Sequence, residues 1–387
     1  MRAMKKKKRL LSSLLTFVGV PLFFSYDVIT LRAFKSFTLP ELVKKILVIE
    51  MFGIGDFVMA SSTFRALRDF YPSSEIVLLT VPTCKDIAAD CPYFDHIIYF
   101  ECPWPSQSVY KYDLGKIVKV IKLIREYHFA MAIDLRGDLR NILFMCLLGV
   151  KYRVGYDVGG GGFLLTHKVP YEGRLKHQVD HNSNIAKFLG ARIKSCKPEL
   201  WVKESNNSLD ILKNIESAKN DVLVAIHPGA NWYGRRWRLS RFAEIVDRLC
   251  KDGINSIIIS SAKEESLIEE IKSNLGYSPH IVITKTLKEL ALLLKRCHLL
   301  ICNDSGPMHI AVAVNTPVIA LFGPQDPTFH GPYGSGHRFI RHVVKCSPCT
   351  QDICVMPENS CMDLITVDEV YDSIKEQIKL IGSKEKQ

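Results

Sequence analysis

The segment DVLVAIHPGANWYGRRWRLSRF, residues 221–242, contains the pattern that decides the fold. Its first six residues predict a buried β-strand, and a helix is predicted to begin near Ser240. Between them lie a His-Pro-Gly turn, Asn231, four closely spaced arginines and two tryptophans that we expect to be exposed. A strand that leads through a turn into a helix is the repeating unit of a parallel α/β sheet.

The same alternation continues on both sides of this segment. Strands are predicted at 44–51, 75–81, 96–100, 129–135, 221–226, 256–261, 280–284, 298–302 and 317–323. Helices are predicted at 56–70, 114–127, 240–253, 263–276, 286–297 and 306–314. The pattern weakens only across 159–163 and 191–218, so we predict two doubly wound α/β domains, at 41–200 and 201–387.

The net charge of +11 is concentrated at the N-terminus. Six of the positive charges come from residues 2–9, which contain no acid. The excess charge therefore does not indicate a basic binding face, and no nucleic-acid partner is predicted. The apolar fraction of 47% and the charged fraction of 24% are ordinary for a globular chain.

The basic start is followed by a short apolar run, LLSSLLTFVGVPLFF, at residues 10–24. Fifteen residues are fewer than the roughly 20 that span a bilayer, and no convincing signal-peptide cleavage site follows. We predict that residues 1–40 associate with an anionic membrane surface as a peripheral or N-terminal anchor. A packed N-terminal helix is the alternative. The twelve scattered cysteines favour a reducing, cytoplasmic setting.

Ligands of doubly wound sheets bind beyond the carboxyl ends of the strands, so the residues after each strand matter most. The first strand is followed by Gly53-Ile54-Gly55-Asp56. Val58 stands where a dinucleotide fingerprint requires a third glycine, so that interpretation fails. Asp56 is either a helix cap or a general base, and its spacing alone favours the cap.

Two later segments predict anion binding. The arginines after residue 226 follow a strand and precede a helix, where guanidinium groups suit a phosphate or diphosphate. The segment NDSGPMHIA, 303–311, places Asp304-Ser305-Gly306 at the start of a helix, whose amide groups and dipole attract anions. His309 lies one turn further. One domain is thus expected to hold two anion sites and the other a carboxylate, with a cleft between the domains. This arrangement predicts the transfer of a group from a diphosphate-activated donor to an acceptor.

The residues that bear on this chemistry resemble those of the lipopolysaccharide heptosyltransferase family, glycosyltransferase family 9. The resemblance rests on MFGIGDFVMASSTFRAL, HPGANWYGRRW and CNDSGPMHIAVAVNTPVIALFGPQDP, and extends from about residue 44 to 380. It implies a GT-B fold of two facing Rossmann-like domains, acceptor-side and nucleotide-sugar-binding in chain order. It also implies an inverting transfer of an ADP-activated heptose that needs no metal, in agreement with the absence of a D-x-D sequence.

The resemblance assigns roles residue by residue. Asp56 corresponds to the family's catalytic base, and Arg235 stands where the family commonly has a lysine that contacts the donor's phosphates. The implied donor-binding residues are Asn231, Arg235, Glu265, Asp304, Ser305, Gly306 and His309. Glu265 falls only loosely where the family has an acid on the adenosine ribose.

Four cysteines form a compact pattern in the loop 346–361. Cys346, Cys349, Cys354 and Cys361 have a spacing that suits a structural zinc or iron–sulfur cluster. The alternative is a set of buried or partly paired thiols. Neither interpretation makes a cofactor necessary for catalysis.

The sequence therefore predicts a glycosyltransferase that moves a heptose, or a related sugar, from an ADP-sugar to a lipopolysaccharide-core or lipid-linked acceptor. We expect it to act at the cytoplasmic face of the inner membrane. Two alternatives remain: a GT-B enzyme that uses a UDP-sugar, and a catalytically inactive, nucleotide-binding membrane scaffold.

Overall fold

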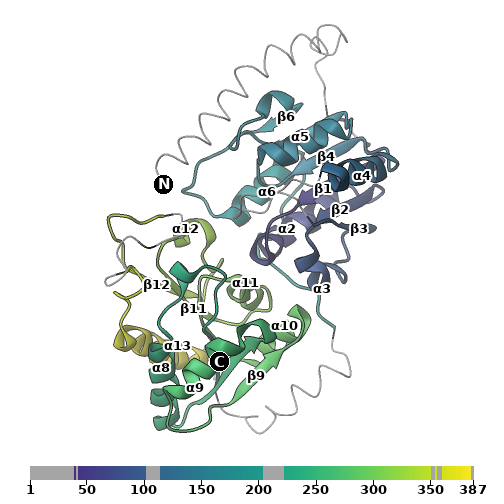
Figure 1. The fold of residues 1–387 in the computed structure, drawn as a ribbon. Coiled ribbons are helices and arrows are strands. Elements are labelled where there is room, and N and C mark those ends of the chain that lie inside the picture. Colours follow the sequence, from purple (N-terminus) through teal and green to yellow (C-terminus); the bar gives the residue numbers. More distant parts are fainter. Residues whose placement is uncertain are drawn as a thin grey trace. The chain divides into compact units, whose positions relative to one another are not determined.

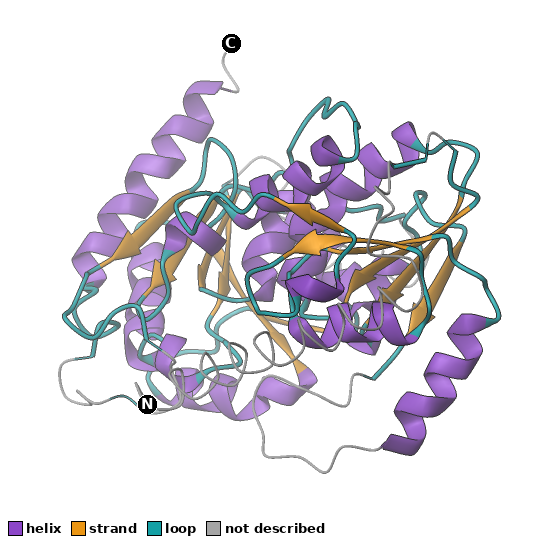
Figure 2. Cartoon of the chain, turned by 90° about the horizontal axis from the view of Figure 1, so that it is seen from above, coloured by secondary structure: helices purple, strands orange, loops and turns teal. Residues whose placement is uncertain are grey.

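The structure is a computed structural model that describes residues 39–40, 42–101, 114–203, 222–349, 354 and 360–384 (Figure 1). Contacts along the chain divide it into two compact units at the junction of Cys196 and Lys197. Each unit is built around one parallel six-stranded sheet. Figure 2 shows strands with helices on both sides of them.

The first unit has the strand order β3-β2-β1-β4-β5-β6. Its strands are β1 (Lys45–Glu50), β2 (Glu75–Thr80), β3 (His96–Tyr99), β4 (Met131–Asp134), β5 (Tyr152–Tyr156) and β6 (His167–Val169). Its helices are α2 (Ile54–Phe70), α3 (Lys85–Ala88), α4 (Leu114–Arg125), α5 (Leu139–Leu147) and α6 (Gln178–Phe188).

The central strands of this sheet are apolar along their whole length because helices cover both of their faces. β1 has the sequence KILVIE, and all of its residues after Lys45 are buried. α2 packs against α6. Residues of α4 and α5 share another core with β1, β2 and β4. The helix α6 is polar, yet Gln178, His181 and Asn182 are buried.

The second unit has the order β12-β11-β10-β7-β8-β9. Its strands are β7 (Leu223–His227), β8 (Asn255–Ser261), β9 (Ile281–Thr284), β10 (Leu299–Asn303), β11 (Val318–Phe322) and β12 (Arg338–Arg341). Its helices are α8 (Leu239–Lys251), α9 (Glu265–Ser273), α10 (Leu287–Arg296), α11 (Gly306–Ala313), α12 (Pro327–His330) and α13 (Val367–Lys384).

The core of the second unit contains a residue that was expected at the surface. Trp237 is fully buried, packs edge-to-face on Phe242 and belongs to the core formed with α8, α9 and α13. The expectation of two exposed tryptophans was therefore wrong for Trp237. Its large indole stabilises more as a core side chain than it would in a solvated turn.

The predicted fold class, two doubly wound parallel α/β domains, is confirmed. In each sheet the chain order reverses beside the first strand: between β1 and β4 in one, and between β7 and β10 in the other. Such a reversal opens a crevice at the carboxyl ends of the two strands, where ligands of this fold bind. These two places are therefore the candidate sites.

The predicted membrane-associating segment, residues 1–40, lies outside the described residues except for 39 and 40. Within the described ranges, none of the helices combines the length and the apolar character needed to cross a lipid bilayer.

Candidate active site

At the reversal point of the first sheet, a carboxylate and a guanidinium lie together. Asp56 is the third residue of α2, after the N-cap residue Gly53, so it is not itself the N-cap. Its Oδ2 accepts a hydrogen bond from the amide of Gly53 at 3.2 Å. Its Oδ1 lies 2.7 Å from Nη1 of Arg136, which follows β4. This geometry is compatible with both functions weighed for Asp56, since one oxygen closes the helix start and the other contacts Arg136.

Arg136 is oriented by its own loop. Asp134, the last residue of β4, accepts hydrogen bonds from the amide of Gly137 at 2.7 Å and from the side-chain nitrogen of Asn141 at 2.8 Å. Gly137 has φ +68°, and a Cβ there would lie 2.7 Å from a backbone oxygen of Tyr156, so only glycine fits. This loop brings the guanidinium of Arg136 over the ring of Phe52, 4.7 Å from its centroid.

Glu50 is a third acidic group beside this pair. It is the last residue of β1 and is fully buried, so its carboxyl group is shielded from water. Burial, reinforced by the charge of Asp56, raises the pKa of Glu50 to about 8 against the opposing effect of Arg136. Glu50 is therefore protonated at neutral pH, which leaves Asp56 and Arg136 as a balanced ion pair.

At the reversal point of the second sheet, Asn303 joins the two strand ends. It ends β10, and its side-chain nitrogen donates to the carbonyl of Pro228 at 2.7 Å. Its Oδ1 accepts from the backbone amide of Trp237 at 3.1 Å. A single buried amide thus fixes both the His-Pro-Gly turn and the end of the arginine-rich segment.

Arg235 and Asp304 meet at this place. Nη1 of Arg235 lies 3.0 Å from Oδ2 of Asp304, whose side chain is only 4% exposed, whereas that of Arg235 is 22% exposed. The buried carboxylate therefore orients a guanidinium that still reaches solvent. Ser305, the N-cap residue of α11, makes no side-chain cap hydrogen bond, and the helix begins at Gly306. A helix start and an oriented cation next to one another form an anion site.

Glu264 lies against the turn that follows β7. Its Oε2 accepts hydrogen bonds from the amide and hydroxyl of Ser261 and lies 3.7 Å from Nε2 of His227. Burial alone would raise the pKa of Glu264, but His227 and Ser261 outweigh burial and lower it to about 2. A Cβ on Gly229 would lie 1.8 Å from Oε1 of Glu264, so the turn approaches this carboxylate closely because it contains glycine.

The other three arginines of the segment have structural partners. Arg236 donates to the carbonyl of Ala230 within its own loop. Arg238 pairs with Asp363, and Arg241 donates to the Asp363 carbonyl. Arg238 is exposed and Arg241 is half-buried, and both bind the turn that leads into α13.

The donor-binding residues predicted from the sequence separate into two groups. Arg235, Asp304, Ser305 and Gly306 lie together at the reversal point. In contrast, His309 is buried in α11, Asn231 is exposed, and Glu265 is an exposed residue at the start of α9.

The sequence interpretation missed Arg136, Glu50 and Glu264. Arg136 follows a predicted strand, so the rule applied to the other strands would have found it. Glu264 is adjacent to the predicted Glu265, and the 3₁₀ turn before α9 determines that Glu264 is the one facing Gly229.

The four cysteines of loop 346–361 are free thiols, and Cys361 is buried. Burial, with a smaller effect of the other three cysteines, raises the pKa of Cys361 to about 11. Across the described part of the chain, no three His, Cys, Asp or Glu side chains are arranged to hold a metal ion. A structural zinc or iron–sulfur cluster at these four cysteines therefore stays a prediction.

Comparison with known proteins identifies relatives of this architecture. The model of glycosyltransferase family 9 (heptosyltransferase) matches residues 117–359. Lipopolysaccharide heptosyltransferase 2 of Salmonella typhimurium is 25% identical over 314 residues, which cover 77% of this chain and 88% of that protein.

Two solved structures share the fold. A family 9 glycosyltransferase from Veillonella parvula superimposes with a TM-score of 0.72 at 20% identity, covering 88% of this chain and 98% of that one. The ADP-heptose lipopolysaccharide heptosyltransferase II of Escherichia coli gives 0.67 at 22% identity, covering 89% and 100%. The predicted GT-B fold is confirmed.

Proposed function

The chain belongs to glycosyltransferase family 9 and is a glycosyltransferase, and we propose that it transfers a heptose from ADP-heptose to a lipopolysaccharide-core or lipid-linked acceptor. The observation that carries this proposal is the presence of one oriented charged pair at the reversal point of each sheet. Asp56 with Arg136 suits the activation of a hydroxyl group, and Arg235 with Asp304 suits the binding of a diphosphate.

The second domain supplies the donor site of the proposed reaction. The diphosphate binds at the start of α11 and is contacted by the guanidinium of Arg235, which Asp304 holds in place. Negative charge grows on the diphosphate as the bond to the sugar breaks. A cation that is already oriented therefore stabilises the transition state more than the ground state.

The adenosine part of the donor lies beside Glu264 in this proposal. An ionised carboxylate accepts hydrogen bonds from the two ribose hydroxyls, and the low pKa of Glu264 keeps it ionised at physiological pH. The close packing of Gly229 against Oε1 holds this carboxylate beside the turn that follows β7. This assignment replaces Glu265, which lies exposed at the start of α9.

The first domain supplies the base. Asp56 takes the proton of the acceptor hydroxyl while that oxygen attacks the anomeric carbon from the side opposite the departing ADP, so the configuration inverts. Arg136 orients the carboxylate before the acceptor arrives. Asp134, Gly137 and Asn141 hold the Arg136 loop in position.

In this scheme Arg235 and the start of α11 neutralise the negative charge of the donor's diphosphate, so the reaction requires no divalent cation. Transfer measured with excess EDTA should equal transfer measured with Mg²⁺. A rate that falls more than tenfold with EDTA and returns with Mg²⁺ would contradict this part of the proposal.

The site of action that we propose is the cytoplasmic face of the inner membrane, where a lipid-linked acceptor is exposed to a nucleotide sugar. The lysines and arginines of residues 2–9 and the apolar run that follows support association with anionic lipid.

The decisive experiment compares donors. ADP-heptose, a UDP-hexose and ADP alone are tested for thermal stabilisation and, where a sugar is present, for turnover on core oligosaccharide, and the anomeric configuration of the product is read by NMR. ADP-heptose should be the active donor and give inversion. Turnover only with the UDP-sugar, or retained configuration, would overturn the proposal. Mass spectrometry of glycolipids from cells lacking the protein then identifies the sugar that is lost.

A further inference from the structure

The helix α4, with the sequence LGKIVKVIKLIR, carries a cation at every third position from Lys116 to Arg125 and contains no acidic residue. At 100° per residue, Lys119 and Lys122 fall on the side of the helix opposite its buried face. Val118 and Leu123 flank them and are 50% and 51% exposed. Along the chain, the nearest acids stand just beyond the two ends of the helix, Asp113 before it and Glu126 after it.

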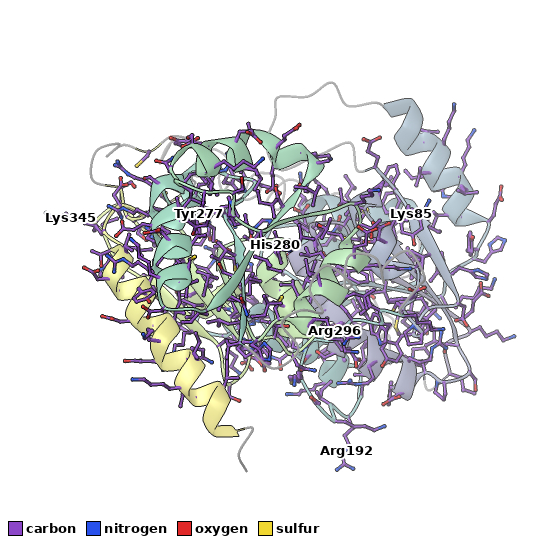
Figure 3. All side chains as sticks on the ribbon, turned by 90° about the horizontal axis from the view of Figure 1, so that it is seen from below. Lys85, Arg192, Tyr277, His280, Arg296 and Lys345 are labelled. Carbon is purple, nitrogen blue, oxygen red and sulfur yellow. The ribbon has the colours of Figure 1, made fainter. Side chains whose placement is uncertain are left out.

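The inner side of α4 is fully used by the core. Ile124 is buried, and Val120 and Ile121 pack against the same cluster, which includes Phe129 and residues of β1 and β4. Val118 and Leu123 on the outer face therefore take no part in packing the helix against the sheet. Figure 3 shows α4 as the pale blue helix at the upper right, with long side chains directed away from the rest of the protein.

The helix α5 meets the end of α4 and carries exposed leucines of its own. Arg125 donates from Nε to the carbonyl of Leu147 at 3.0 Å, which joins the end of α4 to the end of α5 (Figure 1). On α5, Leu143 and Leu147 lie one turn apart and are 46% and 44% exposed. We call the outward side chains of these two helices the α4–α5 surface: Val118, Lys119, Lys122, Leu123, Leu143 and Leu147.

Single exposed leucines are common on soluble proteins and need no explanation. Four exposed apolar side chains on these two helices, three leucines and one valine, are interleaved with lysines, and α4 contains no acid. This is the composition of a helix that lies in a membrane interface. The positive charge favours a lipid bilayer as the partner. A bilayer has an apolar interior and can carry anionic headgroups at its surface. The long lysine stems let the ammonium groups stay at headgroup level while the apolar side chains insert.

We propose that the α4–α5 surface adsorbs to an anionic lipid bilayer. The four apolar side chains enter the boundary between headgroups and acyl chains, and Lys119 and Lys122 pair with anionic headgroups. The biological role of this adsorption rests on the proposed function. Adsorption brings the domain that carries Asp56 to the membrane surface in which a lipid-linked acceptor resides. The adsorption itself requires neither donor nor acceptor.

The test uses the full-length protein and vesicles of phosphatidylglycerol and phosphatidylethanolamine, with phosphatidylcholine vesicles as the neutral comparison. Hydrogen exchange of peptides covering α4 and α5 reports on this surface separately from residues 1–38. Both peptides should exchange more slowly with anionic vesicles and be unchanged with neutral ones. Unchanged exchange in protein that sediments with vesicles would overturn the proposal and assign the binding elsewhere. Protection that appears without vesicles as protein concentration rises would also overturn it, because a second copy would then cover the surface.

A charge-matched pair of variants provides the second measurement. Lys119→Glu/Lys122→Glu should weaken partition into anionic vesicles about 30-fold or more, since each lysine near such a surface contributes about fivefold. The control, Lys85→Glu/Lys187→Glu, makes the same change in net charge at exposed positions of the same domain (Lys85 is labelled in Figure 3). Equal weakening by both pairs would show a general electrostatic effect and contradict the proposal.

Transfer to core oligosaccharide freed from lipid separates this inference from the proposed function. The Lys119→Glu/Lys122→Glu variant should act on that soluble acceptor at the rate of the unmodified protein while losing vesicle binding. If neither protein transfers sugar to the soluble acceptor, the proposed function fails, whereas the vesicle measurements still decide the role of the α4–α5 surface.

Discussion

Oδ1 of Asp56 lies 2.7 Å from Nη1 of Arg136, while Oδ2 of the same carboxylate accepts a hydrogen bond from the amide of Gly53. Both oxygens of the proposed base are therefore held before any substrate binds. Asp56→Asn keeps the shape of the side chain and removes its ability to accept a proton. We expect turnover to fall at least 100-fold, because general-base assistance contributes about 10²–10⁴. ADP affinity, measured by calorimetry, should hardly change; turnover like that of the unmodified protein would leave Asp56 with a helix-capping role only.

Arg136→Gln tests the partner of the base. Without the guanidinium, the Asp56 carboxylate loses its orientation and the nearby cation that favours its ionised form, so we expect kcat to fall about 10- to 100-fold. The pH dependence of kcat should also move, which a purely structural substitution would not cause. Arg140→Gln is the matched control, because Arg140 pairs with Asp138 of the same loop. Equal losses of kcat in the two variants would show that the substitutions act through the stability of the loop and not through the orientation of Asp56.

Arg235→Ala should weaken ADP binding and also lower the rate at saturating donor. Removal of one preorganised charge donor costs about 2–4 kcal/mol of transition-state stabilisation. Lysine at position 235 should recover much of the rate, although it lacks the planar fork of arginine. Arg238→Ala, which removes the pair with Asp363, serves as the control and should affect thermal stability rather than the rate. An effect of Arg235→Ala confined to acceptor affinity would exclude the diphosphate contact.

Glu264→Gln and Glu265→Gln distinguish two adjacent carboxylates. Only Glu264 lies against Gly229 and His227, so its loss should raise the KM for the donor about 10- to 100-fold, the scale of a hydrogen bond to a charged group. Glu265→Gln should behave like the unmodified protein in steady-state kinetics with the donor varied. The reverse ranking would mean that the ribose contact is made by the exposed residue.

Glu50→Gln tests the protonated buried acid through stability. Between about pH 4.5, where a free glutamate ionises, and about pH 8, where Glu50 ionises in the folded protein, the folded state binds more protons than the unfolded state. This group therefore lowers the free energy of unfolding as pH rises through that window, and causes no further loss above it. Glutamine cannot ionise, so the variant should gain stability relative to the unmodified protein between pH 5 and pH 8, on the order of a few kcal/mol.

Thermal melts at several pH values across this window measure the effect, with Glu126→Gln as an exposed control in the same domain. A stability difference between Glu50→Gln and the unmodified protein that stays constant from pH 5 to pH 8 would show that Glu50 is ionised in the folded protein at neutral pH.

The elements with strong apolar periodicity could be predicted from the sequence, and α6 shows why others could not. The helix α6 buries Gln178, His181 and Asn182, so its inward face carries no apolar pattern. Its place is determined by packing against α2 and by hydrogen bonds such as that from Gln178 to Asn182. Tertiary contacts of this kind leave no periodic signal in the chain.

The same distinction applies to the candidate site. Asp56 and Asp304 could be identified because each follows a predicted strand. Arg136 also follows a predicted strand, but its pairing with Asp56 could not be predicted, since the pairing depends on β4 lying beside β1, which is a property of strand order. Glu50 is equally hidden, because a glutamate at a strand end usually faces solvent, and only the surrounding helices make it a buried acid.

Each candidate site is formed by loops that follow two neighbouring strands of its own sheet. In evolutionary terms, the two halves of the substrate specificity can change separately. Under the proposed function, substitutions after β1 and β4 alter which hydroxyl group is recognised, while the strand ends of β7 and β10 continue to hold the same nucleotide. A lineage can therefore acquire new acceptors one domain at a time, without passing through intermediates that have lost the donor.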